Sequence, residues 1–116
     1  MKVLVTGNKG YIGTVLTQML IDKGHEVVGY DISYYEGVES NYLNKDFHQI
    51  VKDIRDIDNV DLKDIKIIFH LAALSNDPLG EFNKKLTYDI NYKSTMKLAR
   101  IAKKSGVSRF IYSSSQ

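Results

Sequence analysis

Three glycines near the N-terminus have the spacing of a phosphate-binding turn. Gly7, Gly10 and Gly13 follow the short β-branched run at residues 2–6 and lead directly into a segment with helical periodicity. Gly7 permits a tight exit from a strand, Gly10 leaves the backbone open to a pyrophosphate, and Gly13 lets a helix lie close to the sheet. The N–H groups and positive dipole end of that helix attract phosphates. Because strand, turn and helix occur in this order, the pattern predicts a dinucleotide site rather than an ordinary glycine-rich turn.

An acidic residue ends the next apolar run. Asp31 follows Val27-Val28-Gly29-Tyr30, at the end of a second predicted strand. A carboxylate at this place can accept hydrogen bonds from both hydroxyls of an adenosine ribose, and it repels the 2′-phosphate of NADP. No arginine follows immediately to compensate. The sequence therefore predicts NAD as the cofactor, against the alternative of a surface aspartate that begins a loop.

Other polar residues near predicted elements allow both a structural and a functional interpretation. Asp53 can cap a helix that begins near Ile54, and Asn91 in a helix can face solvent. The serines at residues 113–115 can form a polar turn. His70, at a strand end, is interpreted as a buried histidine with satisfied hydrogen bonds, and no chemical role is assigned to it.

The elements that must position these residues alternate between strands and helices. Residues 33–46 are polar and predict a loop, and residues 56–62 predict a short helix. The alternation predicts an α/β fold, a Rossmann-type doubly wound parallel sheet in strand order 3-2-1-4-5 with helices on both faces. The ligand crevice then lies between the first and fourth strands. Strands are predicted at residues 2–6, 26–30, 47–52, 66–71 and 109–113, and helices at residues 10–23 and 81–105.

Composition excludes several classes of protein. The 116 residues predict one domain, and a net charge of +2 from dispersed lysines and arginines does not favour nucleic-acid binding. Without cysteine, disulfides and thiolate chemistry are excluded. The three histidines lack the spacing of metal ligands, so no metal site is predicted. No apolar stretch has the length of a membrane span or a signal peptide, and a cytoplasmic location is expected.

Together these motifs resemble the extended short-chain dehydrogenases, in particular the NAD-dependent nucleotide-sugar epimerases and dehydratases. The resemblance extends over the whole chain, and five motifs in one order make it specific. They are Val5-Thr6-Gly7 through Gly13, Asp53-Ile54, His70-Leu71-Ala72-Ala73, Tyr88-Asp89-Ile90-Asn91, and Phe110-Ile111-Tyr112-Ser113-Ser114-Ser115.

The resemblance implies which residues contact the cofactor and the substrate. Ser115 would be the catalytic serine, Ser113 would lie near the nicotinamide, and residues 75–80 would line the substrate side. Hydride would pass from a nucleotide-sugar to NAD and return, as in a UDP-sugar 4-epimerase, through a transient keto sugar. The full-length enzyme would be a homodimer whose interface includes the long helix at residues 81–105. The remaining cofactor contacts implied are Gly7, Gly10, Tyr11, Ile12, Gly13, Asp31, Asp53, Ile54, Leu71, Ala72, Ala73 and Asn91.

One part of the family pattern is missing from the chain. The general base of these enzymes is the tyrosine of a Tyr-x-x-x-Lys pair, and none of the eight tyrosines has lysine four residues later. Residues 1–116 are therefore expected to be the N-terminal NAD-binding portion of a longer enzyme, without its C-terminal substrate domain. Alone they should bind NAD weakly or not at all and should not turn over substrate.

Three alternatives remain open at this point. A non-catalytic dinucleotide-binding module would explain the missing tyrosine, although it would not need the serine cluster and Asn91. A reductase-like relative that uses NADPH is disfavoured by Asp31. A flavodoxin-like regulatory domain shares the alternating elements but lacks the glycine turn.

Overall fold

The computed structural model describes residues 1–32, 47–71 and 84–112, with the backbone alone at residues 84–90. The segment 75–80 and the candidates Ala72, Ala73, Ser113 and Ser115 lie outside these residues. So does the predicted loop at 33–46.

Short runs rich in valine and isoleucine form the strands, and these strands lie parallel in one sheet. Their order is β3-β2-β1-β4-β5, so the predicted Rossmann-type order is confirmed. The runs of β1 and β2 are buried on both faces, as parallel strands between helical layers require, whereas the edge strands β3 and β5 are half-buried or exposed. The strands are β1 (Lys2–Thr6), β2 (Glu26–Asp31), β3 (Phe47–Val51), β4 (Ile67–His70) and β5 (Arg109–Tyr112).

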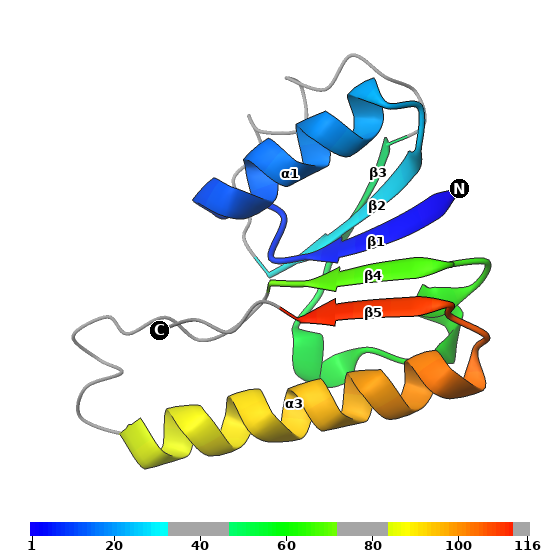
Figure 1. Ribbon diagram of the computed structural model, residues 1–116. Coiled ribbons are helices and arrows are strands. Elements are labelled where there is room, and N and C mark those ends of the chain that lie inside the picture. Colours follow the sequence, from blue (N-terminus) through cyan, green and yellow to red (C-terminus); the bar gives the residue numbers. More distant parts are fainter. Residues whose placement is uncertain (33–46, 72–83, 113–116) are drawn as a thin grey trace.

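Two helices cover opposite faces of the sheet, as Figure 1 shows. The helix α1 (Tyr11–Asp22) follows β1, and the helix α3 (Lys84–Lys104) precedes β5. Side chains alternate along each strand, so the strands contribute to two cores. The core under α1 contains Val3, Val5, Leu20, Ile21 and Val27. The core under α3 contains Leu4, Val28, Tyr30, Ile57, Leu62, Ile65, Ile68, Leu98 and Ala102.

The prediction of one short helix at residues 56–62 is wrong. Two 3-10 turns occupy this region, η2 (Ile54–Asp56) and η3 (Asn59–Leu62). Asp53 caps the first turn and Asp58 caps the second, each by accepting backbone N–H groups. Between them Ile57 is extended and fully buried. Burial of this one side chain in the core interrupts the helical path.

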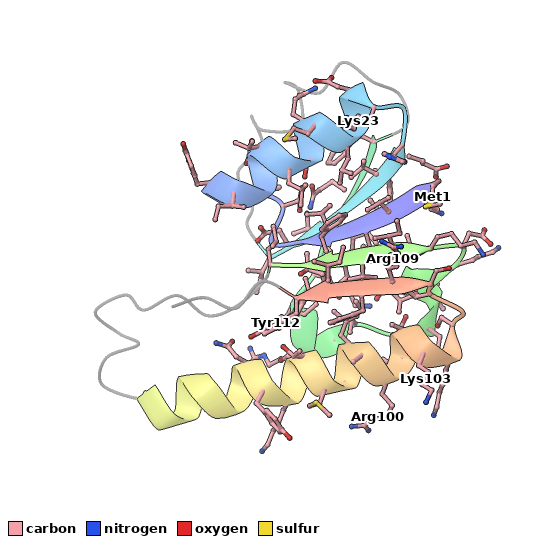
Figure 2. The ribbon with its side chains drawn as sticks, viewed as in Figure 1. Met1, Lys23, Arg100, Lys103, Arg109 and Tyr112 are labelled. Carbon is pink, nitrogen blue, oxygen red and sulfur yellow. The ribbon has the colours of Figure 1, made fainter. Side chains whose placement is uncertain are left out.

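The exposed side chains described in α3 are mostly basic, although Tyr92 and Met96 are exposed as well. Arg100 and Lys103 extend from this helix away from the sheet in Figure 2. Lysines in the last turn also suit the negative end of the helix dipole. Among the helices of residues 1–32, 47–71 and 84–112, none has both the length and the apolar content of a membrane span.

Candidate functional site

The candidate site lies where the chain changes direction at the carboxyl ends of β1 and β4. These two strands are neighbours, with Thr6 opposite His70. The helices that follow these strands, α1 and α3, lie on opposite faces of the sheet (Figure 1). In open α/β sheets this switch point is the usual position of a ligand.

The glycine turn has the geometry that a phosphate site needs. Gly7 has a φ of +70°, in the left-handed region that favours glycine. Its N–H donates to the carbonyl oxygen of Tyr30 at 2.7 Å, and the Gly10 N–H donates to the Gly7 carbonyl at 3.1 Å. Gly10 is the N-cap of α1, none of the described side chains caps this end, and the first turn contains no acidic residue. An anion would meet a positive helix end that no carboxylate of the first turn neutralises.

Gly13 allows the close approach that its spacing predicts. A Cβ atom at this position would lie 2.2 Å from the Gly7 carbonyl oxygen and 2.7 Å from Cα of Asn8. Both contacts are with backbone, which cannot move without distorting the turn. The start of α1 is therefore packed directly on the phosphate turn.

Asp31 contacts the turn itself. Its Oδ2 atom accepts a hydrogen bond from the Lys9 N–H at 3.0 Å. The structure thus brings the predicted ribose-binding carboxylate and the predicted phosphate turn together, although 22 residues separate Lys9 from Asp31 in the chain. This contact joins the two halves of the dinucleotide pattern.

Asn8 was not singled out by its sequence position, yet its side chain is fully buried behind the turn. Its Nδ2 donates to Oε1 of Gln49 at 2.6 Å, and Nε2 of Gln49 donates back to Oδ1 of Asn8 at 3.1 Å. The pair crosses β2 at Gly29, where a Cβ atom would lie 2.3 Å from Nδ2 of Asn8. A glycine inside the apolar strand at residues 26–31 was the available signal, because it often marks a close approach.

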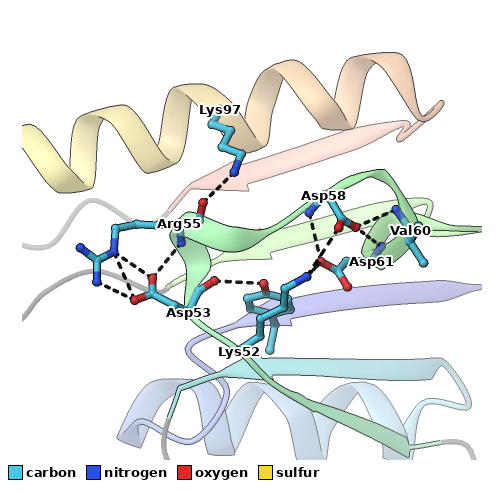
Figure 3. A network of polar contacts seen from close by, with 8 residues as sticks. Lys52, Asp53, Arg55, Asp58, Val60, Asp61 and Lys97 are labelled. Carbon is cyan, nitrogen blue, oxygen red and sulfur yellow. Dashed lines mark hydrogen bonds and ion pairs between the residues drawn. The ribbon is translucent and has the colours of Figure 1, made fainter.

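Asp53 fits the structural interpretation that the sequence left open. It is the N-cap of η2, and its carboxylate forms a two-point ion pair with Arg55, with Nη2 to Oδ2 at 2.7 Å (Figure 3). Hydrogen bonding to Arg55 lowers the pKa of the Asp53 carboxyl. The Asp53 carbonyl accepts from the buried Tyr30 hydroxyl at 3.1 Å, which fixes this segment beside the end of β2. Ile54, the other predicted adenine contact, packs against the core under α3.

A second ionic group joins the residue after β3 to η3 and its N-cap. Lys52 lies 2.9 Å from Oδ2 of Asp61 and 3.7 Å from Oδ2 of Asp58 (Figure 3). The hydrogen bond to Asp61 raises the pKa of Lys52. Burial, followed by the nearby aspartates, raises the pKa of Tyr30. The polar contacts of the segment after β3 are therefore mainly ion pairs near solvent, while Ile57 and Leu62 anchor the segment in the core under α3.

His70 is a buried histidine with satisfied hydrogen bonds, as its interpretation from sequence states. Nδ1 lies 2.8 Å from the Thr6 hydroxyl, and Nε2 lies 3.0 Å from the Thr95 hydroxyl. The ring stacks on Tyr112, with centroids 5.5 Å apart. Burial lowers the pKa of His70 to about 4, so the ring is neutral at pH 7. This neutral ring joins β1, β4 and α3.

The remaining described candidates are placed as follows. Tyr11 and Ile12 are exposed at the start of α1. Leu71 is half-buried, and its N–H donates to the carbonyl and hydroxyl oxygens of Thr6 at the switch point. Asn91 is half-buried in α3 and has an interaction partner. The structure thus brings the glycine turn, Asp31 and Leu71 together at the carboxyl ends of the strands.

Comparison with known proteins agrees with this arrangement. Residues 3–116 match the family described as the NAD dependent epimerase/dehydratase family. The chain belongs to this family. A UDP-glucose 4-epimerase from Klebsiella pneumoniae is 34% identical over 129 residues, which cover 99% of this chain and 89% of that protein. A 3-beta-hydroxysteroid dehydrogenase from Mycolicibacterium neoaurum is 31% identical over 122 residues, and this match covers 98% of this chain and 32% of that protein. Family membership excludes the flavodoxin-like alternative.

A solved structure confirms the fold. The UDP-glucose-4-epimerase from Stenotrophomonas maltophila, with bound NAD and formylated UDP-arabinopyranose, superimposes with a TM-score of 0.87 at 27% identity. The match covers 99% of this chain and 37% of that one. The chain therefore spans less than two-fifths of this relative and of the steroid dehydrogenase. The substrate and the dimer stay predictions.

Proposed function

We propose that this chain is the NAD-binding part of an epimerase or dehydratase that acts on a nucleotide-sugar, with a UDP-sugar 4-epimerase as the favoured activity. The hydrogen bond from the Lys9 N–H to the Asp31 carboxylate carries the cofactor half of this proposal. It places a ribose-binding carboxylate beside a turn shaped for pyrophosphate. The UDP-sugar half rests on the relatives, two of which are named as UDP-glucose 4-epimerases.

Each candidate residue then has a defined task. The backbone of Gly7, Gly10, Tyr11, Ile12 and Gly13 would bind the pyrophosphate. Asp31 would bind the adenosine ribose, Asp53 and Ile54 would lie beside the adenine, and Leu71, Ala72, Ala73, Asn91 and Ser113 would line the nicotinamide side. The bound NAD would supply the hydride acceptor. Ser115 would donate a hydrogen bond to the reacting sugar oxygen.

The steroid dehydrogenase gives a second candidate function, since it matches this chain almost as well as the epimerases do. Both activities use the same cofactor half, so the residues described here do not separate them. The complete protein encoded by the gene should therefore be assayed with UDP-glucose and with a 3β-hydroxysteroid. Conversion of the UDP-sugar supports the proposal, and steroid oxidation alone contradicts it. Residues 1–116 alone should convert neither, because they lack a Tyr-x-x-x-Lys pair.

The cofactor assignment is tested by two substitutions at one position. Asp31→Asn keeps an oxygen that can accept from the Lys9 N–H but removes the charge, whereas Asp31→Ala removes both. We expect Asp31→Asn to reduce the preference for NAD over NADP about tenfold, and Asp31→Ala to weaken both cofactors as well. Asp22→Asn, at the far end of α1, is the matched control. Calorimetric titration of the complete protein measures all four proteins, and an unchanged preference in Asp31→Asn would contradict the assignment.

A further inference from the structure

The turn is fixed from behind by an amide pair that the phosphate motif does not require. Asn8 is the one fully buried residue between Gly7 and Ile12, where its neighbours are exposed or half-buried. A buried amide without partners costs free energy. Here Gln49 supplies both a donor and an acceptor, at 3.1 and 2.6 Å. The two amides therefore satisfy each other, and their orientations are fixed together.

Two glycines shape the space that Asn8 occupies. Gly13 of α1 faces its backbone, with an added Cβ atom 2.7 Å from Cα of Asn8. Gly29 of β2 faces its side chain, with an added Cβ atom 2.6 Å from Cγ of Asn8 and 2.6 Å from Oε1 of Gln49. A side chain at either position would displace Asn8. The residue is thus enclosed between helix and sheet.

The position of the pair in the sheet explains its reach. Val5, Gly29 and Gln49 are aligned in register across β1, β2 and β3. Asn8 follows β1 and extends over Gly29 to Gln49, so it joins the turn to a strand that is not adjacent to β1. The next residue, Lys9, is fixed to another strand, since its backbone N–H donates a hydrogen bond to the Asp31 carboxylate at the end of β2. Consecutive residues of the turn are thereby fixed to two different strands.

We propose that Asn8 and Gln49 are positioning residues, which hold the turn in the conformation that receives the cofactor diphosphate. This inference rests on the proposed function, because it assumes that the turn binds a dinucleotide. Neither amide touches the ligand in this role. The pair aligns the backbone N–H groups of the turn before binding, so less ordering is needed when the ligand arrives.

The test separates positioning of the phosphate turn from general destabilisation. Gln49→Met in the complete protein keeps an unbranched side chain of similar length and removes both hydrogen bonds. The probes are ADP, which carries the diphosphate, and adenosine, which does not. We expect the affinity for ADP to fall about tenfold and the affinity for adenosine to stay within about twofold. NMR titration well below the unfolding temperature measures both.

Two further variants complete the experiment. Gly29→Ala displaces the pair without altering either amide and should reproduce the loss for ADP. Gln18→Met is the matched control, because Gln18 donates to Asp22 on the exposed side of α1 at 2.9 Å, and it should bind both probes as the unmodified protein does. Unchanged ADP affinity in Gln49→Met, or equal losses for ADP and adenosine, would overturn the inference. If the unmodified protein binds neither ADP nor NAD, the proposed function itself fails, which is a different result.

Discussion

The ends of β1 and β3 are anchored by opposite kinds of interaction. After β1, the contacts are mostly neutral and buried: the Asn8–Gln49 amide pair, the His70 ring beside Thr6, and the close approach of Gly13 to the turn backbone. The hydrogen bond from the Lys9 N–H to the Asp31 carboxylate is the charged exception. After β3, the polar contacts are ion pairs near solvent, with Arg55 on Asp53 and Lys52 between Asp58 and Asp61 (Figure 3), and they lie outside the buried Ile57 and Leu62.

The difference shows how positional accuracy is obtained. Buried neutral contacts tolerate little change in shape, since interiors are close-packed. Exposed ion pairs tolerate movement and are screened by salt. The turn that would bind the diphosphate is built in the first way. The surface of the segment beside the proposed adenine position is built in the second way.

The largest effect is expected where helix and turn meet. Gly13→Ala would place a Cβ atom 2.2 Å from the Gly7 carbonyl oxygen. Relief requires a backbone shift, so the free energy of unfolding should fall by about 3 kcal/mol, and binding of NAD should be lost. Urea unfolding and calorimetry measure these effects.

Gly24→Ala is the control for the same chemical change at the other end of α1. Gly24 has a φ of +89° and open space around its Cβ position. The cost there is only the left-handed conformation, about 1 kcal/mol, and NAD binding should remain. Equal losses in the two variants would remove the contrast between close packing and local backbone strain.

A second prediction concerns pH and the buried ring. His70 has its pKa lowered from 6.5 to about 4 by burial. Between these values the unfolded chain binds a proton that the folded chain does not, so stability falls as the pH falls from 6.5 to 4. The full loss is about 3 kcal/mol. Urea unfolding at a series of pH values should show this loss in the unmodified protein and not in His70→Gln.

His48→Gln is the matched control, because His48 is exposed on β3. The pH dependence of the unmodified protein should persist in this variant. The comparison uses the slope of the free energy of unfolding against pH, so the constant cost of the substitution itself cancels. If His70→Gln keeps the slope of the unmodified protein, the ring is not buried as a neutral group, and the contrast with the ionic region fails.

Sequence alone predicts the backbone of this fold well, for a physical reason. Strand positions follow from β-branched runs, and the order of strands follows from the handedness of crossovers. Gly7, Gly13 and Asp31 are placed by local rules of turn geometry. The contact between Lys9 and Asp31 needs only adjacent strand ends, so it too follows from the topology.

The contacts that sequence does not predict are long-range pairings of side chains. Asn8 and Gln49 are 41 residues apart, and no spacing rule joins them. The two 3-10 turns depend on burial of Ile57, which only the assembled core decides. His70 illustrates the intermediate case, because its burial was expected but its hydroxyl partners Thr6 and Thr95 were not.

The smallest effect is expected in the ionic region. Lys52→Met removes the ion pairs with Asp61 and Asp58, and the unfolding midpoint should fall by only about one or two degrees. The loss is small because the three side chains remain partly solvated, and Asp61 keeps its role in the capping box with Asp58. Calorimetric melting at low salt and at high salt measures it.

Salt decides whether this small loss is electrostatic. At about 1 M salt, screening acts over a few ångströms, so the difference between Lys52→Met and the unmodified protein should vanish. Lys63→Met, at an exposed lysine beside η3, is the control and should change little at either salt concentration. A loss that persists in high salt would mean that Lys52 contributes by packing its aliphatic stem. The segment after β3 would then be fixed as rigidly as the phosphate turn.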